Sequence, residues 1–272
     1  MASDVATEEQ IPIEQPAKPQ PPRPRPRIYR TRFSLVYAVL GAATLAAIAG
    51  LVLAITRADV VGGGPAWSTW RPQGGGLGAA SEIAAHVSKG YRLPNGEQLV
   101  DVIAKAPSVS PASQQIPIHY LVVRGSKRNG DQVVSVSPSN SIMYSVCGLG
   151  ASCAIASGKP SVERGTLVRR EILELALYTF KYVGGMKNVV AFMPPTPGNN
   201  PQYVVYLQKH DLATQLELPL MRTLSPKVPL PSAISRREQQ TIDATTESRV
   251  YKFSLSQAQN GDAILVLSPL SA

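Results

Sequence analysis

An uninterrupted apolar run over residues 33–56, FSLVYAVLGAATLAAIAGLVLAIT, places the strongest constraint on this chain because none of its 24 residues is charged. A helix of that length extends about 36 Å and crosses a hydrocarbon core of about 30 Å with some tilt. The run is too long, and begins too far from the N-terminus, for a cleaved secretory signal. A buried soluble helix is the alternative, which the lack of a polar face disfavours. We therefore expect a single transmembrane helix that acts as an uncleaved signal anchor.

The charges that flank this run predict its orientation. Arginines crowd its N-terminal side, whereas its C-terminal side carries only Arg57, close to Asp59, before Arg71. Positive residues beside a membrane span remain in the cytoplasm. We therefore expect a single-pass cell-membrane protein with a cytoplasmic N-terminus and a C-terminal domain outside, its topology set by Arg23, Arg25, Arg27, Arg30 and Arg32.

Residues 1–32 are predicted to form a disordered cytoplasmic tail. The tail opens with acidic and polar residues and continues into a stretch rich in proline and arginine, PQPPRPRPR over residues 19–27. Such a composition favours polyproline II conformations and forms no core. The tail is either a topology signal alone or also a docking segment for a cytoplasmic partner or for inner-leaflet lipid.

Residues 57–78 are expected to be a flexible linker, because two Gly-Gly-Gly triplets interrupt them. Between the triplets lie Trp67 and Trp70, the only tryptophans of the chain. An exposed indole leaves apolar surface in water, so we expect both to dock onto the folded domain. The alternative is insertion into the membrane interface.

Residues 79–272 are predicted to form one extracytoplasmic α+β domain with a mainly antiparallel sheet and helices packed on one face. Apolar residues at three- and four-residue steps predict a long helix over 162–183, whose surface charges lie mostly on the opposite side: Arg164, Arg170, Glu171, Glu174 and Lys181. Shorter helices are expected over 80–90 and 97–106, and a capping box at Ser235 opens another. Strands are predicted, on alternation and flanking turns, over residues 116–124, 131–137, 141–147, 152–156, 188–193, 202–208, 249–255 and 263–267.

The two cysteines of the chain, Cys147 and Cys153, both lie in the region placed outside the membrane. That compartment is oxidising, and the two glycines between them supply the freedom that a tight loop needs. We predict a disulfide between them. No spacing of cysteine and histidine matches a zinc site, so neither a metal nor another cofactor is expected.

A search for catalytic signatures finds no nucleophile elbow, no zinc-protease motif, no phosphate-binding loop and no dinucleotide fingerprint. A cysteine nucleophile served by His119 or His210 would require reduced thiols. His119 has apolar neighbours and is expected to be packed within its strand, whereas His210 is expected at an exposed strand end.

The passage over residues 177–192, LYTFKYVGGMKNVVAF, resembles the corresponding helix-to-strand passage of GerMN-type envelope domains. The resemblance covers this short run alone, and we assign no family from it.

The formal net charge of +9 resides mostly in residues 57–272, which carry 21 Lys/Arg against 14 Asp/Glu. This balance is that of ordinary surface charge, or of contact with anionic lipid or an anionic wall polymer, and no nucleic-acid partner is expected. We expect a membrane-anchored, non-enzymatic interaction or accessory protein of the cell envelope, whose partners include the lipid bilayer and another envelope protein. The alternative is an anchored extracytoplasmic hydrolase whose site the sequence does not reveal.

Overall fold

The computed structural model of the chain describes residues 37, 40, 41, 44, 66–109, 115–125, 130–259 and 261–270. The chain divides into two compact units, Met1–Gly64 and Pro65–Ala272. Most of the expected membrane segment lies outside the described residues, and the four described there are helical. None of the helices formed by described residues has both the length and the apolar character needed to cross a bilayer.

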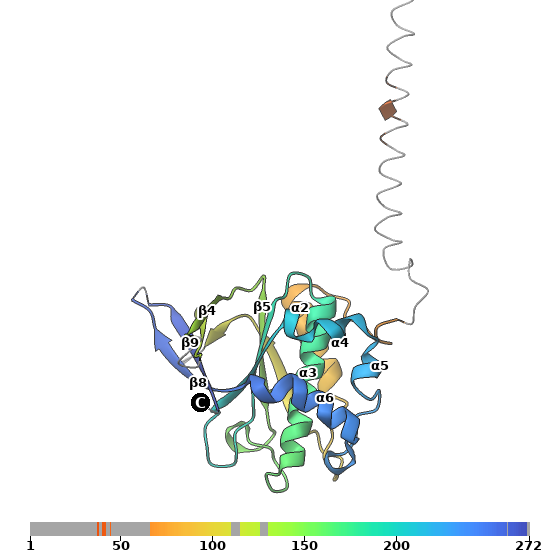
Figure 1. The fold of residues 1–272 in the computed structure, drawn as a ribbon, viewed down its shortest axis with the longest axis vertical. Helices are drawn as coiled ribbons and strands as arrows, with labels where there is room; N and C mark the ends of the chain where they lie inside the picture. The colour runs from red at the N-terminus through yellow and green to blue at the C-terminus, as the bar shows by residue number, and fades with distance from the viewer. Residues whose placement is uncertain are drawn as a thin grey trace, which may run out of the picture. The chain divides into compact units, whose positions relative to one another are not determined.

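The unit Pro65–Ala272 is an α+β domain with a mostly antiparallel, nearly closed sheet (Figure 1). The strands are β1 (Asp101–Lys105), β2 (Ser108–Val109), β3 (Ile116–Val123), β4 (Gln132–Ser135), β5 (Ser141–Cys147), β6 (Asn188–Phe192), β7 (Tyr203–Gln208), β8 (Val250–Gln257) and β9 (Ala263–Pro269). Their order is β1-β5-β6-β7-β8-β9-β3-β2, with β4 paired to β3. Among the strand pairs formed by described residues, β5–β6 and β3–β9 are parallel and the others are antiparallel.

The helices gather on one face of this sheet (Figure 1). They are α2 (Gly76–Ser88), α3 (Val162–Tyr182), α4 (Ala213–Glu217), α5 (Leu220–Thr223) and α6 (Arg236–Thr246), with short 3-10 turns at η2 (Ala151–Cys153), η3 (Lys209–Leu212), η4 (Pro231–Ala233) and η5 (Glu247–Arg249). Ser161 caps α3 and Ser235 caps α6, each accepting a hydrogen bond from the backbone N–H three residues on. The capping box at Ser235 is only half formed, because the Glu238 carboxylate bonds elsewhere.

Two hydrophobic cores lie on the opposite faces of the sheet. Val189 and Ala191 of β6 point into the core beneath the helices, whereas Val190 points into the core inside the curled sheet. Strands buried on both faces read as continuous apolar runs, as the sequence of β6 does. In the sheet, β6 lies between β5 and β7.

Several elements differ from the prediction. Residues 97–106 were expected to form a helix, but β1 occupies Asp101–Lys105 and pairs with β5 along its whole length. Periodicity failed here because a short apolar run fits either period, and the pairing edge of β5 decides between them. The strand expected over 152–156 is also wrong, because η2 and a loop occupy that stretch.

The middle of α3 is buried even on the side that was predicted to be polar. Arg170 and Glu171 are each 0% exposed, since α2 and α6 pack against α3 in addition to the sheet. A helix enclosed on more than one side buries residues that a single-stripe pattern assigns to solvent.

Candidate functional site

A tight turn after β5 leads the chain to the start of α3. Cys147 and Cys153 lie at disulfide distance, with their sulfur atoms 2.10 Å apart. A Cβ on Gly148 would lie 2.1 Å from the Ala154 carbonyl oxygen, so only glycine fits this close approach. The turn thereby directs the segment after Cys153 across the N-terminal end of α3.

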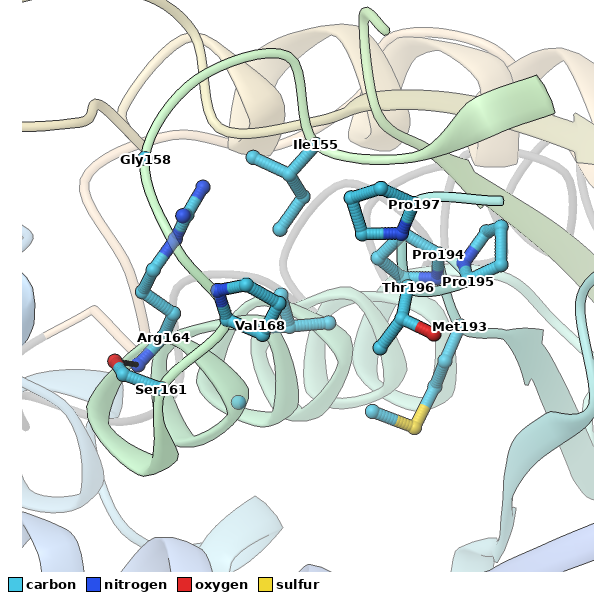
Figure 2. Close-up of a pocket in the computed structure, with 12 residues that line it drawn as sticks. Ile155, Gly158, Ser161, Arg164, Val168, Met193, Pro194, Pro195, Thr196 and Pro197 are labelled. Atoms are coloured by element: carbon cyan, nitrogen blue, oxygen red, sulfur yellow. Dashed lines mark hydrogen bonds between the residues drawn. The ribbon is translucent and has the colours of Figure 1, made fainter. Parts of the chain in front are cut away.

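An apolar pocket of about 170 Å³ opens between this segment and the loop that joins β6 to β7 (Figure 2). We call it the proline pocket. Figure 2 shows Pro194, Pro195 and Pro197 facing Arg164 and Val168 of α3 across it. Its described lining comprises Ile155, Gly158, Pro160, Ser161, Arg164, Gly165, Val168, Met193, Pro194, Pro195, Thr196 and Pro197. Because the ring of each proline fixes its φ angle, this wall has little conformational freedom to lose when a ligand binds.

Arg164 is the one charged residue in the described lining of the proline pocket. Its terminal nitrogens donate to two backbone oxygens, 2.8 Å to Lys159 and 2.6 Å to Ser157. Its Nε is buried without a hydrogen-bond partner among the described residues, where Arg164 also forms no ion pair. Burial lowers the pKa of the Arg164 guanidinium, which still remains charged at neutral pH. The pocket therefore joins an apolar wall to a cation that lacks a counter-charge.

The described lining of the proline pocket is mostly apolar. Its described lining includes no histidine, cysteine, aspartate or glutamate. The Ser161 hydroxyl accepts the capping hydrogen bond from the Arg164 N–H, and the Thr196 hydroxyl accepts one from Asn199. The Glu163 carboxylate, which is exposed and lies outside the described lining, also hydrogen-bonds the Ser161 side chain, and with the capping bond from Arg164 this makes Ser161 part of the cap of α3.

The tryptophans lie at the opposite end of α3. The Trp67 ring meets Tyr178 and Tyr182 edge-on, with centroids 5.5 and 5.6 Å apart, and Trp70 stacks on His86 of α2 at 3.9 Å. The Leu220 N–H donates to the Trp67 carbonyl at 2.7 Å. Burial, together with the nearby charge of Lys89, lowers the pKa of His86, so the stacked imidazole is neutral at pH 7.

The histidines lie apart from each other and from the proline pocket. The side chain of His119 is 49% exposed and lies 4.0 Å from Asp262, so the expectation of a packed histidine was wrong. The pairing of β3 with β9 shifts register between Ile118 and Tyr120, and this irregularity turns His119 outward. His210 is exposed at the end of β7, as expected. Among the described residues, no cluster of histidine, cysteine, aspartate or glutamate suits a metal ion.

A buried polar network crosses the middle of α3. The Arg170 guanidinium donates to Glu238 of α6 at 2.8 Å, to Glu174 at 3.1 Å, to the Ser225 carbonyl at 2.8 Å and to the Tyr91 hydroxyl. Burial acts to raise the pKa of Glu238, but hydrogen bonds from Ser225 and the charge of Arg170 hold it below its usual value. These contacts join α3, α6 and the turn after α2.

Glu171, one residue along, has no such partners. Both of its carboxylate oxygens are buried without a hydrogen bond among the described residues. Burial first, and then the charge of Glu174, raise the pKa of Glu171 well above its usual value. Glu171 is therefore a buried acid whose neutral form is favoured by its surroundings.

Sequence reasoning did not find the proline pocket. The prolines of residues 194–201 indicated only a turn, and Arg164 appeared as one of several surface charges on a helix. Their convergence depends on how the turn after Cys153 folds over α3, which no local pattern encodes.

In comparisons with known proteins, no protein-family model, curated protein or solved structure matches this chain. The short likeness over residues 177–192 is therefore not assigned to a family.

Proposed function

We propose that this chain is a membrane-anchored, extracytoplasmic interaction protein that uses the proline pocket to hold an apolar segment of another envelope protein. The observation that carries the proposal is the pocket itself, which combines a rigid apolar wall with a cation that lacks a counter-charge. An apolar side chain from the partner would fill the cavity, and an adjacent carboxylate would meet Arg164.

The membrane anchor belongs to the same proposal and depends on the sequence of residues 33–56. The uncharged run and the arginines before it support a cytoplasmic N-terminus. A fusion of alkaline phosphatase to the C-terminus should be active in a bacterial host, and a green fluorescent fusion there should remain dark. The reverse pattern would overturn the orientation.

A photo-crosslinking experiment tests the pocket directly. Thr196 is exposed at the pocket rim, so a photoreactive amino acid placed there in the full chain should crosslink to the bound partner in the native envelope. Gly165 lines the pocket and a Cβ there meets nothing within 4 Å, so Gly165→Leu would fill the cavity without disturbing the backbone.

The matched control is Gly78→Leu, because Gly78 is also helical, is exposed and has open space around its Cβ position. We expect one discrete adduct that Gly165→Leu abolishes and Gly78→Leu retains. The absence of an adduct, or one that survives Gly165→Leu, would reject the proline pocket as the binding site.

A further inference from the structure

We infer that a basic groove at the end of the domain where the chain enters it binds the phosphate headgroups of an anionic membrane. The inference rests on the proposed membrane anchor. The groove is separate from the proline pocket, and its described lining comprises Val134, Ser135, Asn140, Lys187, Asn188, Gln208, Lys209, His210, Ala213, Leu216 and Glu217.

The pairing of β6 with β7 creates the cationic part of this basic groove. Asn188 and Gln208 are register partners, so Lys187 just before β6 and Lys209 just after β7 lie side by side. The Lys209 N–H donates to the Lys187 carbonyl at 2.9 Å. Both lysines are exposed, and neither forms an ion pair with a described residue. Holding two such charges together costs repulsion, which a bound phosphate would relieve.

The other polar groups suit the same ligand. His210 adds a ring 3.3 Å from Asp211, but the Arg249 guanidinium, at 2.7 Å, already pairs with that carboxylate. Glu217 is the one acidic residue of the described lining. Lysines act as mobile point charges toward phosphate oxygens, which fits lipid headgroups that present no fixed orientation.

The basic groove lies beside the point where the chain enters the domain. The Lys181 ammonium donates to the Leu216 carbonyl at 3.1 Å and lies 5.7 Å from the centroid of the Trp67 ring. Leu216 lines the groove, so a single lysine links the groove to Trp67. Figure 1 shows α4 and α5 beside the start of the described part of the domain. Two exposed apolar side chains, Leu218 at 46% and Met221 at 65%, lie on this α4–α5 segment.

Chain length limits how far this end lies from the bilayer. Residues 57–65 separate the expected end of the membrane span from the described segment that begins at Ala66. Even fully extended, such a tether spans no more than about 35 Å. Electrostatic attraction to an anionic leaflet decays over a Debye length of about 8 Å at physiological salt, so the groove would meet headgroups only in arrangements in which the tether is far from fully extended.

Vesicle binding by the fragment Pro65–Ala272 tests the inference. This fragment is a compact unit that contains both hydrophobic cores and the cysteine pair. It should co-sediment with vesicles that contain anionic phospholipid and not with pure phosphatidylcholine vesicles, and added salt should weaken the binding. Lys187→Glu with Lys209→Glu should reduce binding at least ten-fold. The control, Lys227→Glu with Lys252→Glu, makes the same change of charge away from the groove. It should retain most of the vesicle binding.

Two results would overturn the inference. One is equal binding by the groove variant and the control, which would indicate only diffuse surface charge. The other is binding to soluble polyphosphate without binding to vesicles, which would indicate a polyanionic polymer. The topology fusions and Thr196 crosslinking do not depend on these lysines, so failure of the basic groove is distinguishable from failure of the anchor or the proline pocket.

Discussion

Both ends of α3 carry apolar surface, but this surface is covered at the C-terminal end and faces a cavity at the N-terminal end. At the C-terminal end, Tyr178 and Tyr182 are covered by Trp67 and Trp70, which come from the chain itself. At the N-terminal end, Val168 faces a cavity walled by prolines. The covered end is packed against the chain's own tryptophans, whereas the uncovered end retains an apolar cavity, which is where we propose that a partner binds. The buried Arg170 network lies between them and joins α3 to α6 and to the turn after α2.

The largest expected effect comes from breaking this network. Arg170→Leu leaves Glu238 and Glu174 buried without their cation, and such a loss costs about 3–5 kcal/mol. Chemical denaturation of Pro65–Ala272 should show this loss, while Arg236→Leu on the exposed first turn of α6 should change the free energy of unfolding by less than about 0.5 kcal/mol. Equal changes in the free energy of unfolding for the two variants would mean that the Arg170 network does not stabilise the domain.

The next effect concerns the covered end. Replacing Trp67 and Trp70 with alanine removes two half-buried indoles, for a combined loss of about 3 kcal/mol. The parent domain should show blue-shifted tryptophan emission without lipid, and the double variant should melt at a lower temperature. Met221→Ala, an exposed apolar control, should melt like the parent. Water-like emission from the parent would contradict docking and favour the membrane interface.

Substitution of Glu171, the neighbour of Arg170, is expected to increase the stability of the domain. The raised pKa of Glu171 means that its contribution is fully present below the carboxyl's ordinary value of 4.5 and is lost as pH rises toward the folded-state value. The groups that face Glu171 are Glu174, Arg170 and Asp101. Glu171→Gln should therefore stabilise the domain by about 1–3 kcal/mol at pH 7.5 and have little effect at pH 4.5.

Denaturation of Glu171→Gln and the parent across this pH range measures the difference directly. A difference in free energy of unfolding that is the same at every pH would show that the pKa of Glu171 is not raised in the folded domain.

The smallest effect concerns the open end. Gly165→Leu replaces a glycine inside a helix and fills empty space, so the free energy of unfolding should change by less than about 1 kcal/mol. Thermal melting checks this. Gly148→Ala, a smaller substitution, should destabilise the domain more, because its Cβ would overlap the Ala154 carbonyl. A large loss in Gly165→Leu would show that the cavity does not stand open in the folded domain.

The sequence alone determined the elements whose signals are local. It predicted α3 within one residue of its observed end, and it predicted β5 and the two strands β8 and β9, because apolar periodicity and strand alternation act within a few residues. The expected membrane span is of the same kind, since an uncharged apolar run carries its own preference for lipid, and it remains a prediction.

Only the tertiary structure decided what depends on distant contacts. Pairing with β5 made residues 101–105 a strand, enclosure by α2 and α6 buried Arg170 and Glu171, and a register shift turned His119 outward. The proline pocket belongs with these, since it joins the turn after Cys153 to a loop some forty residues later in the chain. Local patterns report the preferences of a segment, but which surfaces remain uncovered depends on how all segments pack together.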